Sequence, residues 1–285
     1  MTRHELDGAP THTDFVRSAD GTRLAVRRLG RGSPVLMLHG SGGGFHSWAG
    51  VADRLSREHE LWLLARRGYA PSGIATPPKS FAQDVADVAA VVTAAGEASG
   101  TPVHLVGASY GAIVALHMAA EFPVGIRSLA LFEPPLFARG EHLVPVLDRY
   151  RALVAHGDLA AANRLLLLDV ARVPKPLAEV LTAAGTGLDA RAAIGWLHDL
   201  EALAADSGAA RRWSGIAVPT LLMQGAETWE PMPTTMDQLA STLPRLHRVV
   251  WEGQLHFATS TAPDLVAEEL RRFWHEQESS AGVPG

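Results

Sequence analysis

Short apolar runs alternate with segments of helical periodicity along most of the chain. The apolar runs of strand length are PVLMLHG (34–40), HELWLLA (59–65), PVHLVGA (102–108), SLALFEP (128–134), PTLLMQG (219–225) and LHRVVWEG (246–253). Most are almost continuously hydrophobic, as expected of strands in a parallel sheet that is covered on both faces. Helical patterns intervene, such as SFAQDVADVAAVVTAAG (80–96) and APDLVAEELRRFWHEQE (262–278). This alternation predicts a wound α/β sheet with right-handed crossovers.

The first part of the chain has the pattern of a hairpin instead. TDFVRSA and RLAVRRL flank Asp20-Gly21, a dipeptide that favours a tight turn. We therefore expect two paired strands within the first 30 residues.

One region breaks the alternation of strands and helices. Between the runs 128–134 and 219–225 the chain has helical periodicity and no clear strand. The helical segments there are HLVPVLDRYRALVAHG, DLAAANRLLLLDVAR, PLAEVLTAAG and DARAAIGWLHDLEALAAD. An insertion of this length predicts a helical cap (135–213) over a core domain made of 1–134 and 214–285. A separate helical bundle is the alternative interpretation.

Composition limits the classes of protein and of site. The chain has 285 residues, 47% of them hydrophobic, which is enough for one large α/β domain with a lid or for two small domains. Cysteine is absent, so disulfides, thiolate catalysis and Cys-type zinc sites are excluded. His, Asp and Glu are not clustered at ligand spacing, so we expect no metal and no cofactor.

Charge and hydropathy narrow the expected partners and location. The net charge is −5 and the basic residues are dispersed, which does not favour nucleic acid or an anionic membrane as partner. The N-terminal MTRHELDGAP is polar, and no apolar run reaches the roughly 18 residues that span a bilayer. We expect a soluble cytoplasmic protein, with a homodimer and a monomer both left open.

The pentapeptide GASYG (107–111) is the strongest chemical signal. It follows an apolar run and precedes a helical one, so it is expected to form a strand-to-helix turn. Such a turn is sharp and needs small residues two positions either side of Ser109, which Gly107 and Gly111 supply. The turn would expose the Ser109 hydroxyl at a helix N-terminus, where developing negative charge is stabilised. Ser109 is therefore a candidate nucleophile; an ordinary turn serine is the alternative.

Three further motifs accompany this pentapeptide: His39-Gly40 followed by SGGG, the segment RRGYAPSG (66–73), and Gly253-x-x-His256. With them the chain resembles the α/β-hydrolase fold family over nearly its whole length. The resemblance implies a mostly parallel eight-stranded sheet flanked by helices, with a helical cap inserted after the sixth strand. Ala65 and Ala70 depart from the family's Asp-x-Arg-Gly-x-Gly-x-Ser segment.

His256 follows the last apolar run and is the candidate general base for Ser109. The alternative is a histidine on a surface loop. The backbone N–H of Tyr110 and that of Ser41 or Gly42 are the candidate donors to an oxyanion. The alternative, a phosphate cradle at GSGGG, lacks the Lys-Ser/Thr of a P-loop.

The acid of the expected triad departs from the family pattern. The family usually places an Asp in a Gly-x-x-Asp motif after the strand that here reads PTLLMQG, but Thr228 occupies that position. Glu133, at the end of the run SLALFE, is the strongest candidate, because family branches similar to haloalkane dehalogenases and zearalenone lactonase place their acid there. Glu227 or Glu230, or no functional acid, remain as alternatives.

Aromatic residues and histidines suggest a pocket for an apolar substrate. The candidates are Trp196, His198, Trp213, Trp229, His46 and Trp48. The alternative is that the tryptophans simply join cap to core.

The resulting hypothesis is a serine hydrolase that cleaves a small-to-medium apolar ester or lactone through an acyl-serine. A carbon–carbon bond hydrolase or cofactor-free tailoring enzyme acting on a polyketide-like molecule, and a non-catalytic ligand-binding protein, are the rival hypotheses.

Overall fold

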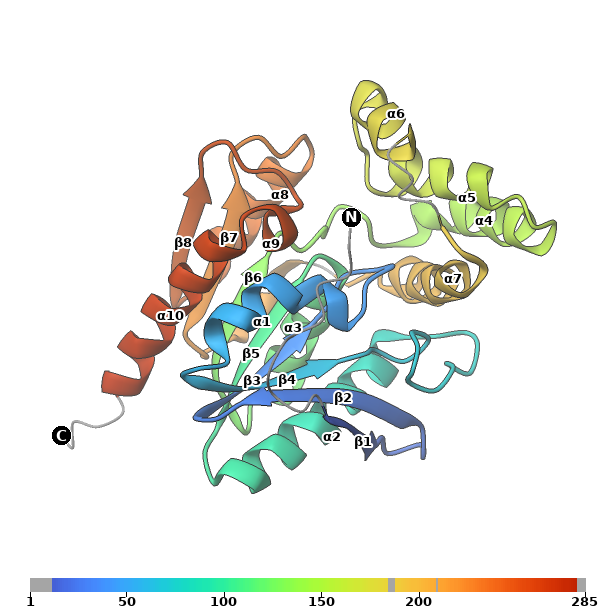
Figure 1. Cartoon of the computed structure of the whole chain (residues 1–285). Coiled ribbons are helices and arrows are strands. Elements are labelled where there is room, and N and C mark those ends of the chain that lie inside the picture. The colour runs from blue at the N-terminus through green and yellow to red at the C-terminus, as the bar shows by residue number, and fades with distance from the viewer. Residues whose placement is uncertain (1–11, 184–187, 209, 281–285) are drawn as a thin grey trace.

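The computed structural model describes residues 12–183, 188–208 and 210–280. Its centre is an eight-stranded sheet with helices on both faces (Figure 1). The strands are β1 (His12–Arg17), β2 (Arg23–Gly30), β3 (Ser33–Leu38), β4 (His59–Leu64), β5 (Val103–Ala108), β6 (Ile126–Phe132), β7 (Thr220–Gly225) and β8 (Leu246–Trp251).

Helices fill most of the connections between these strands. The α-helices are α1 (Ala49–Leu55), α2 (Phe81–Ser99), α3 (Tyr110–Glu121), α4 (Val144–Ala155), α5 (Leu159–Leu165), α6 (Lys175–Ala183), α7 (Ala190–Ala205), α8 (Met232–Ala240), α9 (Ala258–Thr261) and α10 (Pro263–Ser280). Short 3-10 helices lie at Phe45–Trp48, Glu141–Leu143 and Ala210–Gly215, and a π-helical turn lies at Leu166–Val170.

The strand order is β1-β2-β4-β3-β5-β6-β7-β8. Strand β2 is antiparallel to both of its neighbours, and every pair from β4 onward is parallel. The expected hairpin is confirmed: Gly21 has a φ of 84° in the turn, and Asp20 Oδ1 accepts the Thr22 N–H at 3.0 Å. The mostly parallel eight-stranded sheet is therefore the one that the family resemblance implied.

Two hydrophobic cores lie on opposite faces of this sheet. In β3, Val35 and Met37 join the core beneath α1 and α10, whereas Leu36 and Leu38 join the core beneath α2 and α3. Successive side chains of a strand point to opposite faces, so a strand covered on both sides must be apolar throughout. This explains why the central runs of the sequence lack polar alternation.

The long helix α2 is delimited by its own sequence. At its N-terminus the Ser80 N–H donates to Gln83 Oε1 at 3.0 Å, as in a capping box. At its C-terminus Gly100 has a φ of 70°, the left-handed conformation that favours glycine. These two signals determine where α2, which connects β4 to β5, begins and ends.

Residues 135–213, which we call the helical insertion, separate β6 from β7. The expected helices are present there as α4, α5, α6 and α7, with α5 extended by the π-helical turn. They form one group beside the sheet (Figure 1), and Leu147, Leu165 and Leu200 continue the core of α2 and α3. The division of the chain into a core domain and a cap domain stays a prediction.

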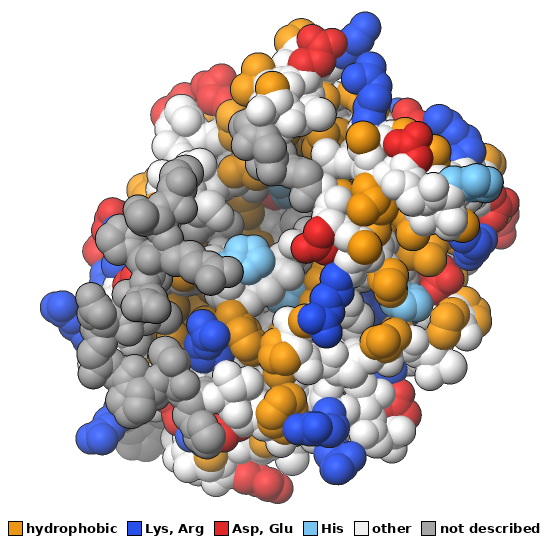
Figure 2. Space-filling model, turned by 45° about the vertical axis from the view of Figure 1, so that its right-hand side comes forward, with side chains coloured by type: hydrophobic (Ala, Val, Ile, Leu, Met, Phe, Trp, Pro, Cys, Tyr) orange, Lys and Arg blue, Asp and Glu red, His pale blue; other side chains and the backbone are white. Residues whose placement is uncertain are grey.

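The surface mixes charges of both signs. On the face drawn in Figure 2, basic and acidic side chains are interspersed with hydrophobic ones. Within the described ranges, no helix combines the length and the hydropathy needed to cross a membrane.

Candidate active site

The turn between β5 and α3 carries Ser109 in a strained backbone conformation. Ser109 has φ 54° and ψ −122°, a region that a residue with a side chain rarely adopts. A Cβ on Gly107 would lie 2.4 Å from Gly111 O, and a Cβ on Gly111 would lie 2.5 Å from Leu38 O. Both glycines are therefore required for strand and helix to approach closely enough to form the turn.

Three side chains from distant segments form one hydrogen-bonded row. His256 Nε2 lies 3.1 Å from Ser109 Oγ, and His256 Nδ1 lies 2.6 Å from Glu133 Oε2. An ionised carboxylate only accepts hydrogen bonds, so Nδ1–H donates to Glu133 and Nε2 is left to accept the Ser109 O–H. This arrangement holds the imidazole in the tautomer that a general base requires.

Glu133 follows β6 with its side chain completely buried and with a φ of 42°. Its Oε1 accepts the Gly225 N–H at 2.8 Å and the Thr228 hydroxyl at 2.7 Å, while Oε2 accepts from His256. A buried carboxylate needs such partners, because burial without them is costly. Thr228, where the family pattern expects an Asp, lies on the loop after β7 and donates its hydroxyl to Glu133.

The alternative acids lie elsewhere. Glu227 and Glu230 are exposed side chains on the loop after β7. The Nδ1 of His256 is bonded to Glu133, so neither Glu227 nor Glu230 is the partner of that nitrogen.

The loop after β3 passes directly beside Ser109. A Cβ on Gly40 would lie 3.1 Å from Ser109 Cβ. Across the site, Tyr110 is the first residue of α3, a position whose N–H has no partner within the helix. Both backbone segments therefore lie next to Ser109.

Ser41 and Gly42, the two loop positions predicted as oxyanion donors, differ in the hydrogen bonding of their backbone N–H groups. The Gly42 N–H donates to the Tyr69 hydroxyl at 3.1 Å, so the prediction of Gly42 as a candidate oxyanion donor does not hold in this structure. The Ser41 N–H has no hydrogen-bond partner among the described residues. The Ser41 hydroxyl donates to Asp199 Oδ2 at 2.6 Å, which leaves the backbone of Ser41 as the remaining candidate.

A cavity of about 270 Å³ opens above Ser109 and His256. Trp48, Trp196 and Trp229 line it, as expected. Its other lining residues include the apolar Phe132, Leu166, Leu167, Val173 and Phe257 and the polar Ser41, Ser47, Asn163, Thr259 and Ser260. A second, smaller space of about 50 Å³ also contacts Ser109 and is bordered by Phe137, Leu203 and Met232.

Three predicted pocket residues do not line either space. His46 is exposed, and His198 is buried with its Nδ1 bonded to Glu201 Oε2 at 3.1 Å. Trp213 is completely buried, edge-on to His117 at 5.0 Å. For Trp213 the alternative interpretation therefore holds: its ring packs against other side chains and does not face a cavity.

A group of buried charges beneath the Ser41 loop was not foreseen from the sequence. Asp199 on α7 accepts from both terminal nitrogens of Arg66, at 3.0 and 2.7 Å. Burial alone would raise the pKa of Asp199, but the charges of Arg66 and Lys79 hold that pKa well below its usual range. These partners lie far from Asp199 in the sequence, so no local pattern announces the group. Within the described ranges, no three His, Asp or Glu side chains are grouped so that they could hold a metal ion.

Comparisons with known proteins agree with this architecture. A family model described as alpha/beta hydrolase fold matches residues 33–263. Pyrrolizixenacetamide deacetylase from Xenorhabdus hominickii is 33% identical over 141 residues, so this chain aligns with only 51% of that protein and the match covers 49% of this chain.

Longer matches cover nearly the whole chain. Pimeloyl-[acyl-carrier protein] methyl ester esterase from Xanthomonas campestris pv. campestris is 30% identical over 86% of this chain and 96% of that protein. The crystal structure of an alpha/beta hydrolase from Sphaerobacter thermophilus superposes with a TM-score of 0.77 at 29% identity, covering 92% of this chain and 100% of the other. The chain therefore belongs to the alpha/beta hydrolase fold family and is a hydrolytic enzyme.

Proposed function

We propose that the protein cleaves a small-to-medium apolar carboxylic ester or lactone through an acyl-serine intermediate. The observation that carries this proposal is the row Glu133–His256–Ser109, with separations of 2.6 and 3.1 Å, at the floor of an apolar cavity. A serine hydroxyl becomes a nucleophile when a correctly oriented base accepts its proton.

In the acylation step, Ser109 Oγ attacks the carbonyl carbon of the substrate while its proton passes to His256 Nε2. The carbonyl oxygen becomes an oxyanion, which the backbone N–H groups of Tyr110 and Ser41 stabilise. When the tetrahedral intermediate collapses, the bond to the leaving oxygen breaks and His256 returns the proton to that oxygen.

Deacylation repeats these steps with water as the nucleophile. His256 takes a proton from water, the hydroxide attacks the acyl carbon, and the proton returns to Ser109 Oγ as the acid product leaves. Glu133 stabilises the imidazolium that forms in each half of the reaction and keeps Nε2 directed at Ser109.

The cavity supports an apolar substrate of modest size. Its volume is about 270 Å³, and Trp196 and Trp229 border both this space and the smaller one beside Ser109. The relative from Xanthomonas campestris is an ester hydrolase by name, which favours an ester over other carbonyl substrates. A lactone is kept within the proposal because of the position of Glu133 after β6.

A series of short p-nitrophenyl esters tests the proposal, with wild type compared against Ser109→Ala and Glu133→Gln. We expect Ser109→Ala to abolish turnover and Glu133→Gln to lower kcat by roughly 10²–10⁴-fold, as loss of a triad acid does. Glu227→Gln is the matched control, because it removes an exposed carboxylate on the next loop and should leave kcat unchanged.

Two outcomes would contradict the proposal. If Glu133→Gln is as active as wild type, the assignment of the acid is wrong. If wild type hydrolyses no ester and an organophosphonate does not label Ser109, the acyl-serine mechanism is wrong. A panel of diketones then tests carbon–carbon bond hydrolysis.

A further inference from the structure

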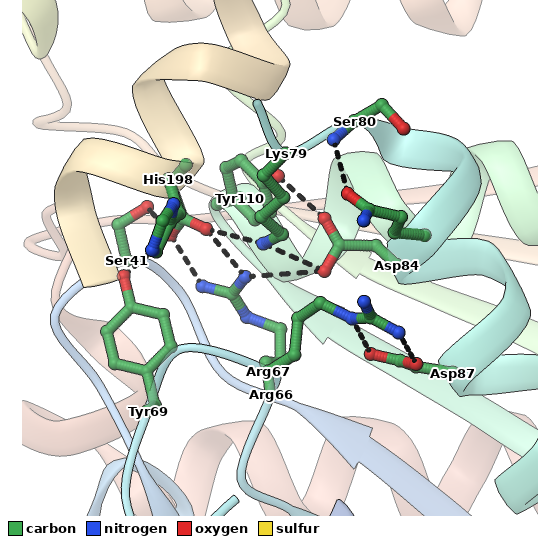
Figure 3. Close-up of polar contacts among 12 residues, drawn as sticks. Ser41, Arg66, Arg67, Tyr69, Lys79, Ser80, Asp84, Asp87, Tyr110 and His198 are labelled. Carbon is green, nitrogen blue, oxygen red and sulfur yellow. Dashed lines mark hydrogen bonds and ion pairs between the residues drawn. The ribbon is translucent and has the colours of Figure 1, made fainter. Parts of the chain in front are cut away.

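Arg66, Lys79 and Asp84 lie together as buried charges beside α7 of the helical insertion (Figure 3), and Asp199 on that helix completes the cluster. Lys79 Nζ lies 2.9 Å from Asp84 Oδ1 and 2.9 Å from Asp199 Oδ1. Arg66 forms the two-nitrogen pair with Asp199 and lies 3.9 Å from Asp84. None of these side chains is more than 2% exposed. Two cations thus balance two carboxylates away from solvent.

Each carboxylate of this cluster also holds one side of the proposed oxyanion site. Asp199 Oδ2 accepts the Ser41 hydroxyl at 2.6 Å, and Asp84 Oδ2 accepts the Tyr110 hydroxyl at 2.7 Å. The two residues whose backbone N–H groups border the carbonyl position are therefore anchored, through their side chains, on a single charge cluster. The guanidinium carbon of Arg66 also lies 4.3 Å from the centre of the Tyr110 ring.

The cluster also grips the backbone that precedes Ser41. Arg66 Nε donates to His39 O at 2.9 Å, and Arg66 Nη2 donates to Gly40 O at 3.3 Å. The same guanidinium therefore binds both the Asp199 carboxylate and the carbonyls of the loop.

The helix that carries Asp199 packs tightly against this loop. A Cβ on Gly42 would lie 2.8 Å from Trp196 Nε1, and a Cβ on Gly195 would lie 2.5 Å from the Tyr69 ring. Trp196 and Asp199 are three residues apart on α7 and so share a face of the helix. On that face, Trp196 lies against Gly42 and Asp199 accepts the Ser41 hydroxyl.

We propose that Asp199 is a positioning residue for the oxyanion site, so that α7 of the helical insertion is a working part of the catalytic centre and not only its cover. The inference rests on the proposed function. Docking of α7 supplies the carboxylate that fixes Ser41, while Asp84 fixes Tyr110. Lys79 and Arg66 tie the two carboxylates together, so the two N–H donors are held at one separation.

The reason for such an arrangement is geometric. An oxyanion donor is effective only when it is held in place before the charge develops, and a displacement of about 1 Å can cost roughly 10²-fold in rate. Residues 40–44 include four glycines, which lack the side chains that restrict a backbone. The cluster supplies that rigidity from outside the loop.

Asp199→Asn tests the proposal against Asp87→Asn as the matched control. Asp87 is also buried and also forms a two-nitrogen pair with an arginine, Arg67, at 2.7 and 2.6 Å. Rates are normalised to the Ser109 that an organophosphonate labels, so that unfolded protein is not counted. We expect Asp199→Asn to lower kcat by roughly 10–10²-fold with KM little changed. Asp87→Asn should leave kcat within about twofold of wild type, because Asp87 bonds Arg67 and not the Ser41 loop.

A trifluoromethyl ketone separates positioning from general damage, because it adds to Ser109 and places an oxyanion in the site. Its affinity should fall with Asp199→Asn by about the same factor as kcat/KM. A ketone affinity that stays at the wild-type level would overturn the proposal. Equal losses of kcat in the Asp199 and Asp87 variants would overturn it as well.

Ser41→Ala keeps the proposal testable if Asp199→Asn does not fold. This variant removes one hydroxyl from the cluster and retains the Ser41 backbone N–H. We expect a loss in kcat of roughly three- to tenfold, again with KM unchanged. If the wild type hydrolyses esters and Ser41→Ala has the same kcat, the inference is wrong and the proposed function stands. If the wild type hydrolyses no ester and Ser109 is not labelled, the proposed function and the inference are both wrong.

Discussion

Arg66 and Arg67 are consecutive in the chain and almost equally buried, at 2% and 1% exposed, yet they serve different regions. Figure 3 shows Arg66 directed toward α7, whereas Arg67 is directed toward Asp87 on α2. On α7, Asp199 accepts from Arg66 Nη2. Arg67 also reaches Asp20 in the N-terminal hairpin at 2.8 Å. One arginine therefore joins the insertion to the candidate site, and the other joins the hairpin to the core.

The comparison shows that a buried ion pair does not by itself indicate function. Both arginines bind a carboxylate through two nitrogens, and breaking such a pair typically costs about 3–5 kcal/mol because it leaves an uncompensated buried charge. Stability alone therefore does not distinguish them. What distinguishes them is the remaining contacts: Arg66 also binds the carbonyls of His39 and Gly40 beside Ser109.

The largest expected difference is between Arg66→Lys and Arg67→Lys. Lysine keeps the charge but cannot form the two-nitrogen fork. Arg66→Lys should lower kcat per labelled Ser109 by roughly 10–10²-fold, because the loop loses its carbonyl contacts. Arg67→Lys should leave kcat within about twofold, because the partners of Arg67 are Asp87, Asp20 and Ser18 rather than the loop. Both variants should lower the melting temperature in a thermal unfolding experiment.

A double variant provides the control for this comparison. If Arg66 and Asp199 hold the loop as one unit, combining Arg66→Lys with Asp199→Asn should raise the activation free energy by much less than the sum of the two single increases. Strict additivity of the two losses would mean that the residues act separately. A loss in Arg67→Lys as large as that in Arg66→Lys would show that general packing, and not the loop, controls the rate.

Two buried histidines, His39 beside Arg66 and His104 on β5, should make the free energy of unfolding depend on pH. Burial, with the Arg66 charge as the second cause, lowers the pKa of His39 to about 3, and burial lowers the pKa of His104 to about 4. Both pKa values lie below that of an unfolded histidine, about 6.5. The unfolded state therefore binds more protons below this pH, and the free energy of unfolding should fall as the pH decreases from 6.5 toward 4.

Urea unfolding at pH 7, 6 and 5 measures this effect. Each such histidine contributes a slope of up to about 1.4 kcal/mol per pH unit, or tenfold in the unfolding equilibrium constant. His104→Asn should reduce the slope and leave the share of His39. A free energy of unfolding that is flat or rises between pH 6.5 and 5 would show that these two histidines are not buried in the neutral form.

Much of the fold could be predicted because its signals are local. The apolar runs, the Asp20-Gly21 turn and the helical periodicity of the insertion each depend on neighbouring residues, and the sheet follows them closely. The structure also brings together Ser109, His256 and Glu133, which the motifs and the strand order had singled out. Their catalytic roles remain a proposal.

The details that sequence reasoning missed depend on contacts between distant segments. Asp199 and Lys79 are separated by 120 residues, and Asp199 and Tyr69 by 130, so no spacing pattern links them. Trp213 resembled a pocket residue because aromatic residues suit pockets, but its ring is enclosed beside His117. Gly42 resembled an oxyanion donor because it follows His39-Gly40, but the Tyr69 hydroxyl takes its N–H.

The smallest expected effect on kcat is that of removing the Tyr69 hydroxyl. Tyr69 O–H donates to Asp199 Oδ2 at 2.7 Å and accepts the Gly42 N–H, so Tyr69→Phe removes one donor from the cluster and frees one donor on the loop. We expect kcat per labelled Ser109 to fall by roughly three- to fivefold, because the loop loses one of its anchors. Ser18→Ala, which removes a hydroxyl beside Arg67, is the matched control and should have no effect on kcat.

The direction of the Tyr69→Phe effect matters more than its size. A fall in kcat means that the hydroxyl is worth more as an anchor of the loop than as a competitor for the Gly42 N–H. A rise in kcat, together with tighter binding of the trifluoromethyl ketone, would mean that the freed Gly42 N–H joins the oxyanion site. In that case Gly42 would be restored as a donor, and Tyr69 would be a residue that limits the rate of the enzyme.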